Sequence, residues 1–532
     1  MSANKREEKQ LMKLAHSLLV LVFLFFGIRA IAADQPQWGQ AWSRNMISSE
    51  RQLPDSFDPK TGKNIKWSAK LGTQTFSTPI VAGGRVYIGT NNEEPRNPKY
   101  KGDRGVMLCF AEKTGKLLWQ LVVPKREDDP FCDWPKTGMS SPVTVEGNRV
   151  YLVNNRGEVM CLDARGMANG NDGPFRGEAI HMVPKIVGEE VTRLTNSSAH
   201  ESLLTSAPKK MQPGPTDADI RWLFDLTSGA GIWSHDAAHS SILIDGDFLY
   251  LNTGTGVDNT HKVIRTPSAP SLVVLNKKTG KFVARDNENI APNIFHATWS
   301  SPAMGKVAGR NLIFFCGGNG VVYAFEPLAT NFQSSDVAKL KKVWQFDFDP
   351  SAPKTNVHQY STNRRESPSN IYGMPVFHRE RLYVAGGGDI FWGKNEAWLK
   401  CIDATKTGDI TTQGLVWSYS LEKHVLSTPA VYNDCVFIAD CGRKVHCVDA
   451  KTGEPFWTHE IHGEVWASPL VADGKVYLGT RNGDFWIFAA NKEKKILGKV
   501  EIGTPINATA TIANGVLYVA TMSHLYAVEE PE

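Results

Sequence analysis

Residues 77–119 read STPIVAGGRVYIGTNNEEPRNPKYKGDRGVMLCFAEKTGKLLW. This stretch begins with Ser/Thr-Pro, alternates short apolar segments with turn residues, and ends in Thr-Gly-x-x-x-Trp. Short apolar segments rich in Val, Ile, Leu and Tyr, separated by Gly and Asn, predict β-strands joined by tight turns. The stretch therefore predicts one small antiparallel sheet, whose Thr-Gly turn supplies a residue that tolerates a positive φ.

The same unit returns along almost the whole chain. Its starts are Ser77, Ser140, Ser240, Ser300, Met374, Ser427, Ser468 and the neighbourhood of Thr504-Pro505. Repeats of about 40 residues with several strands each indicate a β-propeller, because no such unit buries both of its faces alone. We predict an all-β fold, an eight-bladed β-propeller of four-stranded antiparallel blades.

The last repeat reaches the C-terminus after its third strand, at residues 525–528. A fourth strand is available at the other end of the sequence, where residues 64–69 read NIKWSA and carry the Trp that is typical of the outer strands. We expect this N-terminal strand to pair with the eighth blade and close the ring, since closure removes an exposed sheet edge.

These features divide the chain into three parts. We predict a signal peptide over residues 1–32, an N-terminal lead-in over 33–63 and the propeller over 64–532. Residues 165–220, within blade two, are polar and rich in Gly, Pro and Ser. We expect this insertion to be loosely packed.

The signal peptide is predicted from the order of its charged and apolar residues. Lys5, Arg6, Lys9 and Lys13 precede the apolar residues 18–28, and Ala30-Ile31-Ala32 follows as a small-residue cleavage site. The apolar stretch is short for a membrane span. We expect a protein that is exported, either to the periplasm or to the medium, without a transmembrane segment.

Charge and cysteine content exclude several classes of function. The formal net charge is +4 over 532 residues, with acids and bases interspersed, so we expect no nucleic-acid partner and a monomer. Cys109, Cys161, Cys401 and Cys447 occupy the same third-strand position in four repeats, which indicates packing rather than disulfides. No Cys-x-x-Cys-His motif is present, so no covalent haem is expected.

The long insertions predict where a ligand would bind. In a four-stranded blade, the loops between the second and third strands and the loops between blades lie on the same face of the ring. Five long loops belong to these two kinds: 91–104, 124–137, 252–270, 349–370 and 386–397. We call this the five-loop face, and expect it to carry the function because loops on a rigid scaffold commonly do.

Polar and aromatic residues of these loops are the candidate ligand-binding set. They are His235, Asp236, His239, Asn259, His261, Trp299, Asp389, Trp392 and Trp134. The His-Asp-x-x-His order over residues 235–239 offers metal-ligating atoms, but hydrogen-bonded structural histidines are commoner. We therefore predict no metal site.

The blade signature Ala111-x-x-Thr114-Gly115-x-x-x-Trp119, which returns over residues 449–457, resembles the Trp-docking motif of quinoprotein propellers. The resemblance covers essentially the whole chain after the predicted signal peptide. That family contains alcohol and sugar dehydrogenases, which use pyrroloquinoline quinone (PQQ) and Ca²⁺. It also contains non-catalytic relatives, such as the propeller of the outer-membrane assembly machinery.

Two local departures argue against the dehydrogenase activity that this resemblance implies. Where those enzymes have Gly-Thr-Gly-Asn, with the Asn on Ca²⁺, this chain reads GTGV over residues 254–257. Where they have His-Asp-x-Trp-Asp, with the first Asp as base, it reads HATWS over 296–300. An alkyl side chain neither ligates Ca²⁺ nor abstracts a proton. In a diverged enzyme, His296 or Asp258 would be the substitute base.

Three hypotheses follow. The leading one is a periplasmic scaffold without a cofactor, which presents the five-loop face to a protein or a small-molecule ligand. The second is a diverged oxidoreductase that uses PQQ with Ca²⁺ and passes electrons to a separate cytochrome. The third is a polysaccharide-binding or lyase-type propeller, in which Trp134, Trp299 and Trp392 serve as stacking platforms.

Overall fold

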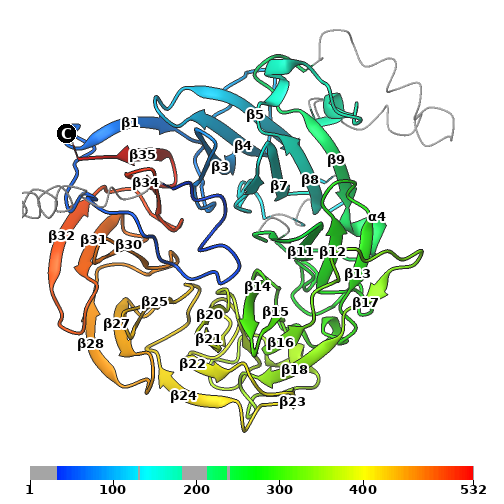
Figure 1. The fold of residues 1–532 in the computed structure, drawn as a ribbon, viewed down its shortest axis with the longest axis vertical. Helices are drawn as coiled ribbons and strands as arrows, with labels where there is room; N and C mark the ends of the chain where they lie inside the picture. Colours follow the sequence, from blue (N-terminus) through cyan, green and yellow to red (C-terminus); the bar gives the residue numbers. More distant parts are fainter. Residues whose placement is uncertain are drawn as a thin grey trace, which may run out of the picture.

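The computed structural model describes residues 33–530, except 127, 130, 131, 133, 182–212 and 237–239. The predicted signal peptide, residues 1–32, lies outside the described residues, as does His239. Within the described part, no helix is both long and apolar enough to cross a membrane. Eight antiparallel sheets surround one axis, so the predicted eight-bladed, all-β propeller is confirmed (Figure 1).

Each blade consists of consecutive strands that run outward from the axis. The first four blades are β2 (Ile80–Ala82), β3 (Arg85–Asn91), β4 (Arg104–Ala111) and β5 (Leu117–Pro124); β6 (Thr144–Glu146), β7 (Arg149–Val153), β8 (Glu158–Asp163) and β9 (Ile220–Asp225); β10 (Leu243–Asp245), β11 (Phe248–Asn252), β12 (Leu272–Asn276) and β13 (Phe282–Arg285); and β14 (Ala303–Val307), β15 (Arg310–Cys316), β16 (Val321–Phe325) and β18 (Lys342–Asp347). Cys109, Cys161, Cys401 and Cys447 lie buried in third strands, as the packing interpretation requires.

The other four blades follow the same order. They are β20 (Val376–His378), β21 (Arg381–Gly388), β22 (Ala397–Asp403) and β24 (Leu415–Ser420), with β19 (Ser369–Asn370) also paired to β21; β25 (Ala430–Tyr432), β26 (Cys435–Ala439), β27 (Lys444–Asp449) and β28 (Pro455–Glu460); β29 (Leu470–Ala472), β30 (Lys475–Gly479), β31 (Asp484–Ala489) and β32 (Ile496–Glu501); and β33 (Thr511–Ala513), β34 (Val516–Ala520), β35 (His524–Val528) and β1 (Ile65–Lys70). Strand β1 pairs antiparallel with β35, with Trp67 opposite Ala527, so the predicted closure of the ring is confirmed.

The outer-strand Trp of one blade docks on the turn of the next blade. Trp67 Nε1 donates to the carbonyl of Glu112 at 2.7 Å. A Cβ added to Gly115 would lie 2.6 Å from the Trp67 ring, and Gly115 has φ +66°. The turn therefore requires glycine both for its backbone conformation and for the approach of the indole. The Trp residues that donate in this way are Trp67, Trp119, Trp222, Trp344, Trp417 and Trp457.

Hydroxyl groups at the start of the inner strands link the blades near the axis. The Thr428 amide donates to Ser468 Oγ at 2.9 Å, and the Ser468 amide donates to Thr509 Oγ1 at 3.0 Å. The Ser/Thr of the repeat is thus an inter-blade hydrogen-bond acceptor. This contact corrects the predicted start of the eighth repeat, because Thr509, rather than Thr504, holds the equivalent position directly before β33.

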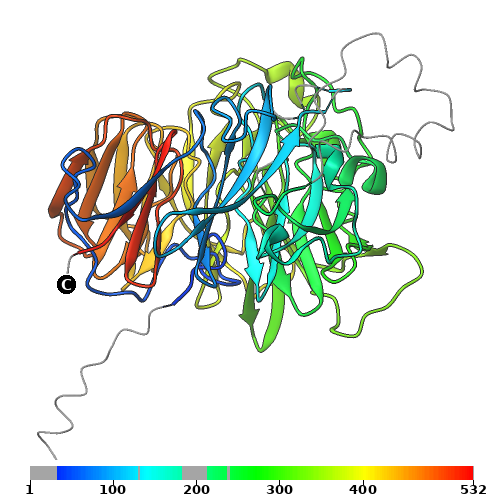
Figure 2. The same cartoon turned by 90° about the horizontal axis from the view of Figure 1, so that it is seen from above.

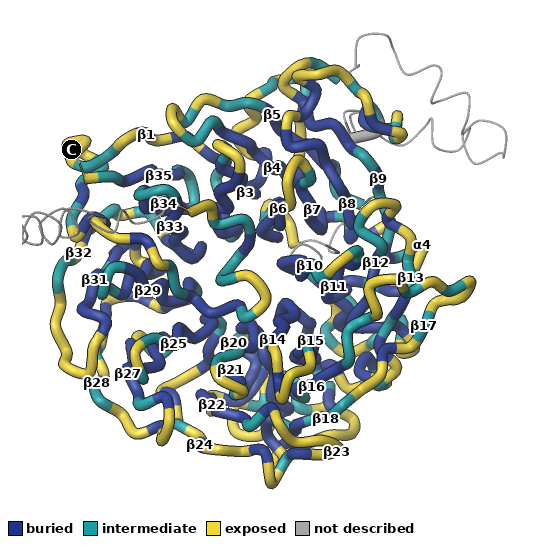
Figure 3. Tube along the Cα trace, viewed as in Figure 1, coloured by how far each residue is buried: buried dark blue, intermediate teal, exposed yellow. Residues whose placement is uncertain are grey.

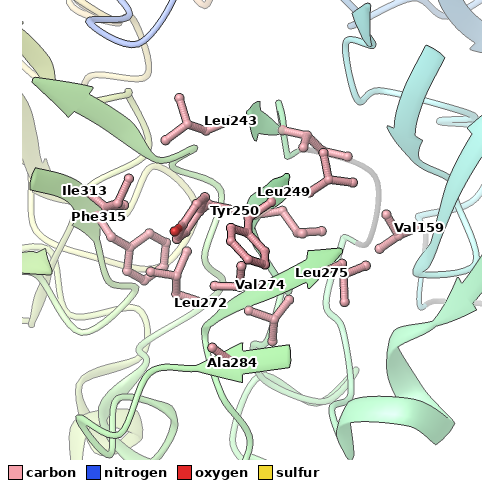
Figure 4. Close-up of a cluster of buried hydrophobic side chains, with 14 of the residues drawn as sticks. Val159, Leu243, Leu249, Tyr250, Leu272, Val274, Leu275, Ala284, Ile313 and Phe315 are labelled. Carbon is pink, nitrogen blue, oxygen red and sulfur yellow. The ribbon is translucent and has the colours of Figure 1, made fainter. Parts of the chain in front are cut away.

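Apolar side chains fill the spaces between blades. Figure 4 shows such a cluster, in which Val159 of β8 and Phe315 of β15 approach the side chains of blade three. The inner and middle strands are largely buried, while the turns at the outer rim are exposed (Figure 3). Each blade therefore contributes both faces to the core, which is the reason that its strands read as nearly continuous apolar runs.

Connections between third and fourth strands extend the outer edge of the preceding blade. Strand β17 (Ala338–Lys339) pairs in parallel with β13, and β23 (Gly408–Asp409) pairs in parallel with β18. In the predicted insertion 165–220, Asp217 forms a single parallel bridge with Gln120 of β5. The expectation of loose packing is therefore wrong for residues 217–220, which are buried beside β5; residues 182–212 lie outside the described part.

The lead-in runs along one face of the disc and into the middle of the ring (Figures 1 and 2). Ile47 pairs with Val471 of the inner strand β29. Arg44 is fully buried and donates to the carbonyls of Ser241 and Pro302, each at 2.9 Å. Burial lowers the pKa of the Arg44 guanidinium to about 9. The lead-in therefore belongs to the core, where it joins blades that are far apart in sequence.

Replacing Arg44 with Met should lower the free energy of unfolding by about 3 kcal/mol, because buried carbonyls of two blades lose a charged donor. The measurement is urea unfolding followed by tryptophan fluorescence. Arg51→Met is the matched control, since Arg51 is an exposed arginine of the same lead-in, and it should leave stability almost unchanged. Equal losses in the two variants would contradict the central role of Arg44.

Candidate functional site

The five long loops contact one another and form a connected surface. Lys136 Nζ in loop 124–137 lies 2.8 Å from Glu93 Oε1 in loop 91–104. Asp129, also in loop 124–137, accepts from Arg265 Nη1 at 3.0 Å. Because Arg265 belongs to loop 252–270, these two ion pairs join three of the five loops.

The remaining two loops join this surface through an arginine and an aromatic contact. Arg364 of loop 349–370 donates to the carbonyls of Phe391 and Gly393, at 2.7 and 2.9 Å. The Trp392 ring lies 4.7 Å from the ring of His261 in loop 252–270. In the sequence, Arg364-Arg365-Glu366 is most simply interpreted as a solvated loop, yet Arg364 fixes the loop that carries Asp389 and Trp392.

A buried ion pair anchors the same loop from below. Lys394 Nζ lies 2.5 Å from Asp349 Oδ2, and both side chains are buried. Burial alone would raise the pKa of Asp349, but its hydrogen bonds to Lys394, Ser369 and Ser351 lower that pKa to about 2. The loop that carries Asp389 therefore has a fixed path.

Three histidines converge at the centre of this surface. His235 and His296 come from the segments that lead into blades three and four, and His261 comes from the loop between β11 and β12. His235 Nε2 lies 3.1 Å from His296 Nε2. The His261 ring lies 4.9 Å from the His235 ring and 5.2 Å from the His296 ring. One ring nitrogen from each residue falls within 4.8 Å of the others, so the three imidazoles could hold one cation.

Asp389 and Tyr372 orient His296. His296 Nδ1 lies 2.9 Å from Asp389 Oδ2, and the Tyr372 hydroxyl donates to the same carboxylate oxygen. Burial alone would lower the pKa of His296, but the Asp389 carboxylate raises it. Burial also opposes ionisation of Asp389, whose pKa nevertheless falls to about 2 beside His296. For His235, burial outweighs the effect of the nearby Asp236 carboxylate and lowers the pKa to about 4.

Trp299 and Asp236 also lie at the histidine cluster. The Trp299 ring packs 4.5 Å from the Tyr372 ring and 5.9 Å from the His296 ring. Asp236 Oδ2 lies 3.8 Å from His235 Nε2. The structure therefore brings six of the predicted site residues together: His235, Asp236, His261, Trp299, Asp389 and Trp392.

The other candidates lie at the periphery. Asp258 accepts from Thr260 Oγ1 at 2.8 Å and from the Val263 amide at 3.2 Å, so its carboxylate organises its own turn. Although burial opposes its ionisation, these hydrogen bonds lower the Asp258 pKa. Asn259 contacts Asp129 at 3.4 Å. Trp134 is half exposed.

Sequence reasoning missed Tyr372 and Phe391. Phe391 is 43% exposed, and its ring lies 5.7 Å from His296 and 6.4 Å from Trp466. It therefore connects the histidine cluster to a neighbouring cleft of about 460 Å³. The residues that line the cleft include Arg364, Phe391, Lys423, His424, Glu464, Trp466 and Arg481, so basic side chains outnumber acidic ones.

A second group of metal-ligating residues, Asp163, Asp172 and Asp219, lies away from this face in blade two. Arg221 Nη1 lies 3.6 Å from Asp163 Oδ2 and 3.8 Å from Asp219 Oδ2, and it donates to Asp172. A guanidinium thus already supplies the positive charge that these carboxylates require.

The residues at the site do not fit Ca²⁺. The Val257 amide donates to the His296 carbonyl at 2.9 Å, and Gly256 pairs with Ala297. The segments 254–257 and 296–300, which differ from the dehydrogenase motifs, therefore lie side by side. Val257 and Ala297 are buried alkyl side chains. The nearest cluster of donor atoms is made of imidazole nitrogens, whereas Ca²⁺ requires six to eight oxygen ligands.

Comparison with known proteins agrees with the propeller and its repeat. The model of the PQQ-like repeat family described as "Outer membrane protein assembly factor BamB" matches residues 103–345 and 395–496. The chain belongs to this family.

Individual relatives are distant. The outer membrane protein assembly factor BamB of Legionella pneumophila (strain Paris) is 25% identical over 117 residues. That match covers 22% of this chain and 27% of the relative, so the chain spans about a quarter of the length of this curated relative. The crystal structure of BamB from Moraxella catarrhalis aligns with 87% of this chain and 97% of that chain, at 12% identity and a TM-score of 0.49. The designed Ika8 protein aligns with 91% of this chain and 99% of that chain, at 9% identity and a TM-score of 0.47.

Replacing Asp349 with Asn should lower the free energy of unfolding by about 3 kcal/mol near pH 7, because buried Lys394 keeps only the exposed Glu396 as a counter-charge. The folded-state pKa of Asp349 is below its ordinary value of 3.8. Its stabilisation is therefore present above about pH 4 and is lost as the pH falls toward 2. The measurement is urea unfolding of both proteins across this pH range.

An exposed ion pair provides the control for that variant. Glu326 lies 2.9 Å from Lys341, and both side chains are exposed. Glu326→Gln should change stability little at any pH. A stability difference between wild type and Asp349→Asn that stays constant from pH 5 to pH 2 would show that the Asp349 carboxylate titrates normally.

Proposed function

We propose that this protein is a periplasmic scaffold that binds a segment of a partner protein on its five-loop face. The observation that carries the proposal is the exposure of large apolar side chains on these interlocked loops. Val263 is 52% exposed, Trp134 is 50% exposed, and Phe391 stands beside the basic cleft. Exposed aromatic groups beside charged residues are typical of protein-binding surfaces.

The chemistry of the cleft suggests what the partner segment contains. The guanidinium of Arg481 lies 4.0 Å from the centre of the Trp466 ring, and Arg481 Nη1 lies 3.1 Å from Glu464. Lys423 and Arg364 add two further positive charges. A segment with an aromatic or aliphatic side chain next to a carboxylate would complement this surface. Family membership supports the same proposal, since the described relatives are named as assembly factors.

A photocross-linking amino acid at position 391 should capture a defined partner in cells that express the full chain. The matched control is position 415, because Leu415 is 39% exposed on the outer strand of the same blade. Mass spectrometry identifies the captured protein. Phe391→Ser should then weaken its affinity by about tenfold or more in calorimetry with the purified partner. Equal capture from positions 391 and 415, or none from positions 134, 263 and 391, would contradict the proposal.

Export is tested separately. Residues 1–40 fused to alkaline phosphatase should give phosphatase activity in a Gram-negative host, because that enzyme needs an oxidising compartment to form its disulfides. The control fusion carries Lys or Asp within residues 18–28, which breaks the apolar stretch. Activity in both fusions, or in neither, would exclude these residues as the export signal.

The two competing hypotheses stay open to direct test. Binding of PQQ with Ca²⁺, followed by reduction of an artificial acceptor, would favour the diverged oxidoreductase, with His296 as the first residue to replace. A sugar-binding propeller requires exposed stacking platforms. Trp299 and Trp392 are partly buried against Tyr372 and His261, so only Trp134 retains the exposure that this function needs.

A further inference from the structure

The geometry points to a mononuclear site for a divalent transition metal, Zn²⁺, held by His235, His261 and His296. This inference does not depend on the proposed partner. The ring nitrogens of the three residues lie within 4.8 Å of one another. The 3.1 Å between the Nε2 atoms of His235 and His296 matches two nitrogens that each lie about 2.0–2.1 Å from one Zn²⁺.

The rings of His235 and His296 place their Nε2 atoms opposite each other, where a cation could bind both. His296 Nδ1 faces Asp389, which only accepts, so the proton of neutral His296 belongs on Nδ1. The Nε2 atom of His296 then carries a lone pair, and it faces the Nε2 atom of His235 at 3.1 Å. Such a pair is repulsive unless a proton or a metal ion lies between the nitrogens.

The support behind His296 is of the kind that metal sites use. Asp389 holds Nδ1 of His296, and Asp389 itself accepts from the amides of Phe391 and Trp392 at 2.9 and 2.7 Å. A carboxylate that fixes the far nitrogen of a histidine sets the tautomer and orients the ligating nitrogen. Asp389 is therefore a positioning residue for the site.

The donor set selects the metal. Neutral imidazoles favour Zn²⁺, Cu²⁺ and Ni²⁺ over Mg²⁺ and Ca²⁺. Carboxylates of Asp389 and Asp236 nearby offset the charge of a divalent ion. Three histidines leave a fourth tetrahedral position, which water or an incoming ligand fills in open zinc sites. His261 is only half buried, so the cluster is reached from the five-loop face.

The sequence-based prediction of no metal site considered only the motif over residues 235–239. The structure instead groups His235 with two histidines that lie 26 and 61 residues further along the chain. The proposed site replaces that prediction and makes no use of His239.

Calorimetric titration of the tag-free, chelator-treated full chain with Zn²⁺ tests the site. We expect one equivalent to bind the wild type tightly, His261→Ala to lower the affinity at least tenfold, and Asp389→Asn to lower it 10- to 100-fold. His462→Ala is the matched control, because His462 is an exposed histidine outside the cluster. The affinity of this variant for Zn²⁺ should equal that of the wild type. The chain has 14 histidines, so this control separates the site from adventitious binding.

Cobalt provides an independent readout that a misfolded variant would not mimic. Co²⁺ should give intense visible absorption typical of tetrahedral nitrogen coordination in the wild type and in His462→Ala, and much weaker absorption in His261→Ala. Zn²⁺ should raise the melting temperature of the wild type but not of His261→Ala, whose circular dichroism should match the wild type. No stoichiometric Zn²⁺ binding, or equal affinity in His261→Ala, would overturn the proposal and leave a proton shared between His235 and His296.

Discussion

The docking of each outer-strand indole on the turn of the next blade is the contact on which the ring depends. Trp67 reaches from blade eight to blade one, where its ring covers Gly115 and its Nε1 donates to the Glu112 carbonyl. Strand β1, which carries Trp67, also completes the sheet that begins with β33. One N-terminal strand thus supplies both the missing edge and the last inter-blade contact. Six of the eight outer strands carry such an indole, so most neighbouring blades are joined by this contact.

The two faces of the ring have different tasks. On one face the lead-in places Arg44 against the carbonyls of Ser241 and Pro302, which ties blades three and four to the N-terminal segment. On the other face the long loops support one another through Asp129, Arg364 and the Asp349–Lys394 pair. Loops that are anchored by buried ion pairs and charged hydrogen bonds hold side chains in fixed positions, which a binding site needs. Rigidity at the candidate site therefore comes from contacts between loops, in addition to the scaffold beneath them.

The sequence predicts the ring well because each repeat is specified by residues that lie close together in the sequence. A Thr-Gly turn, an apolar strand and a Trp recur at a fixed period, so the blades, the closing strand and the five-loop face follow from pattern and topology. The start of a repeat is misplaced where the pattern weakens. In the eighth repeat the Thr-Pro pair occurs at Thr504-Pro505, whereas Thr509 makes the inter-blade hydrogen bond that marks the start of the inner strand. The central segment around Arg44 has no periodicity, so its burial in the core was not predictable.

The site is harder to predict because its members meet only through the curvature of the ring. His235, His261 and His296 belong to one blade and its two flanking connections, but Asp389 and Tyr372 belong to the blade after next. Sequence spacing favoured the motif at 235–239, whereas the path of the loops joins His235 to His296. Arg364 and Phe391 carry no signal in the sequence, since an exposed arginine and a loop phenylalanine are common residues.

The chemistry of the site depends on the donor atoms that its residues offer to a cation. The segments 254–257 and 296–299 lie side by side, as the pairing of Gly256 with Ala297 shows, and buried alkyl groups of Val257 and Ala297 stand where the resemblance to quinoprotein dehydrogenases implies oxygen donors. What remains around them is a set of imidazoles, one of which is held by a carboxylate. Hard cations favour oxygen and borderline cations favour nitrogen, so this replacement changes the kind of ion that the same position in the ring could hold. The blades of a propeller can thus stay the same while the donor atoms on its five-loop face change, and the chemistry of the site changes with them.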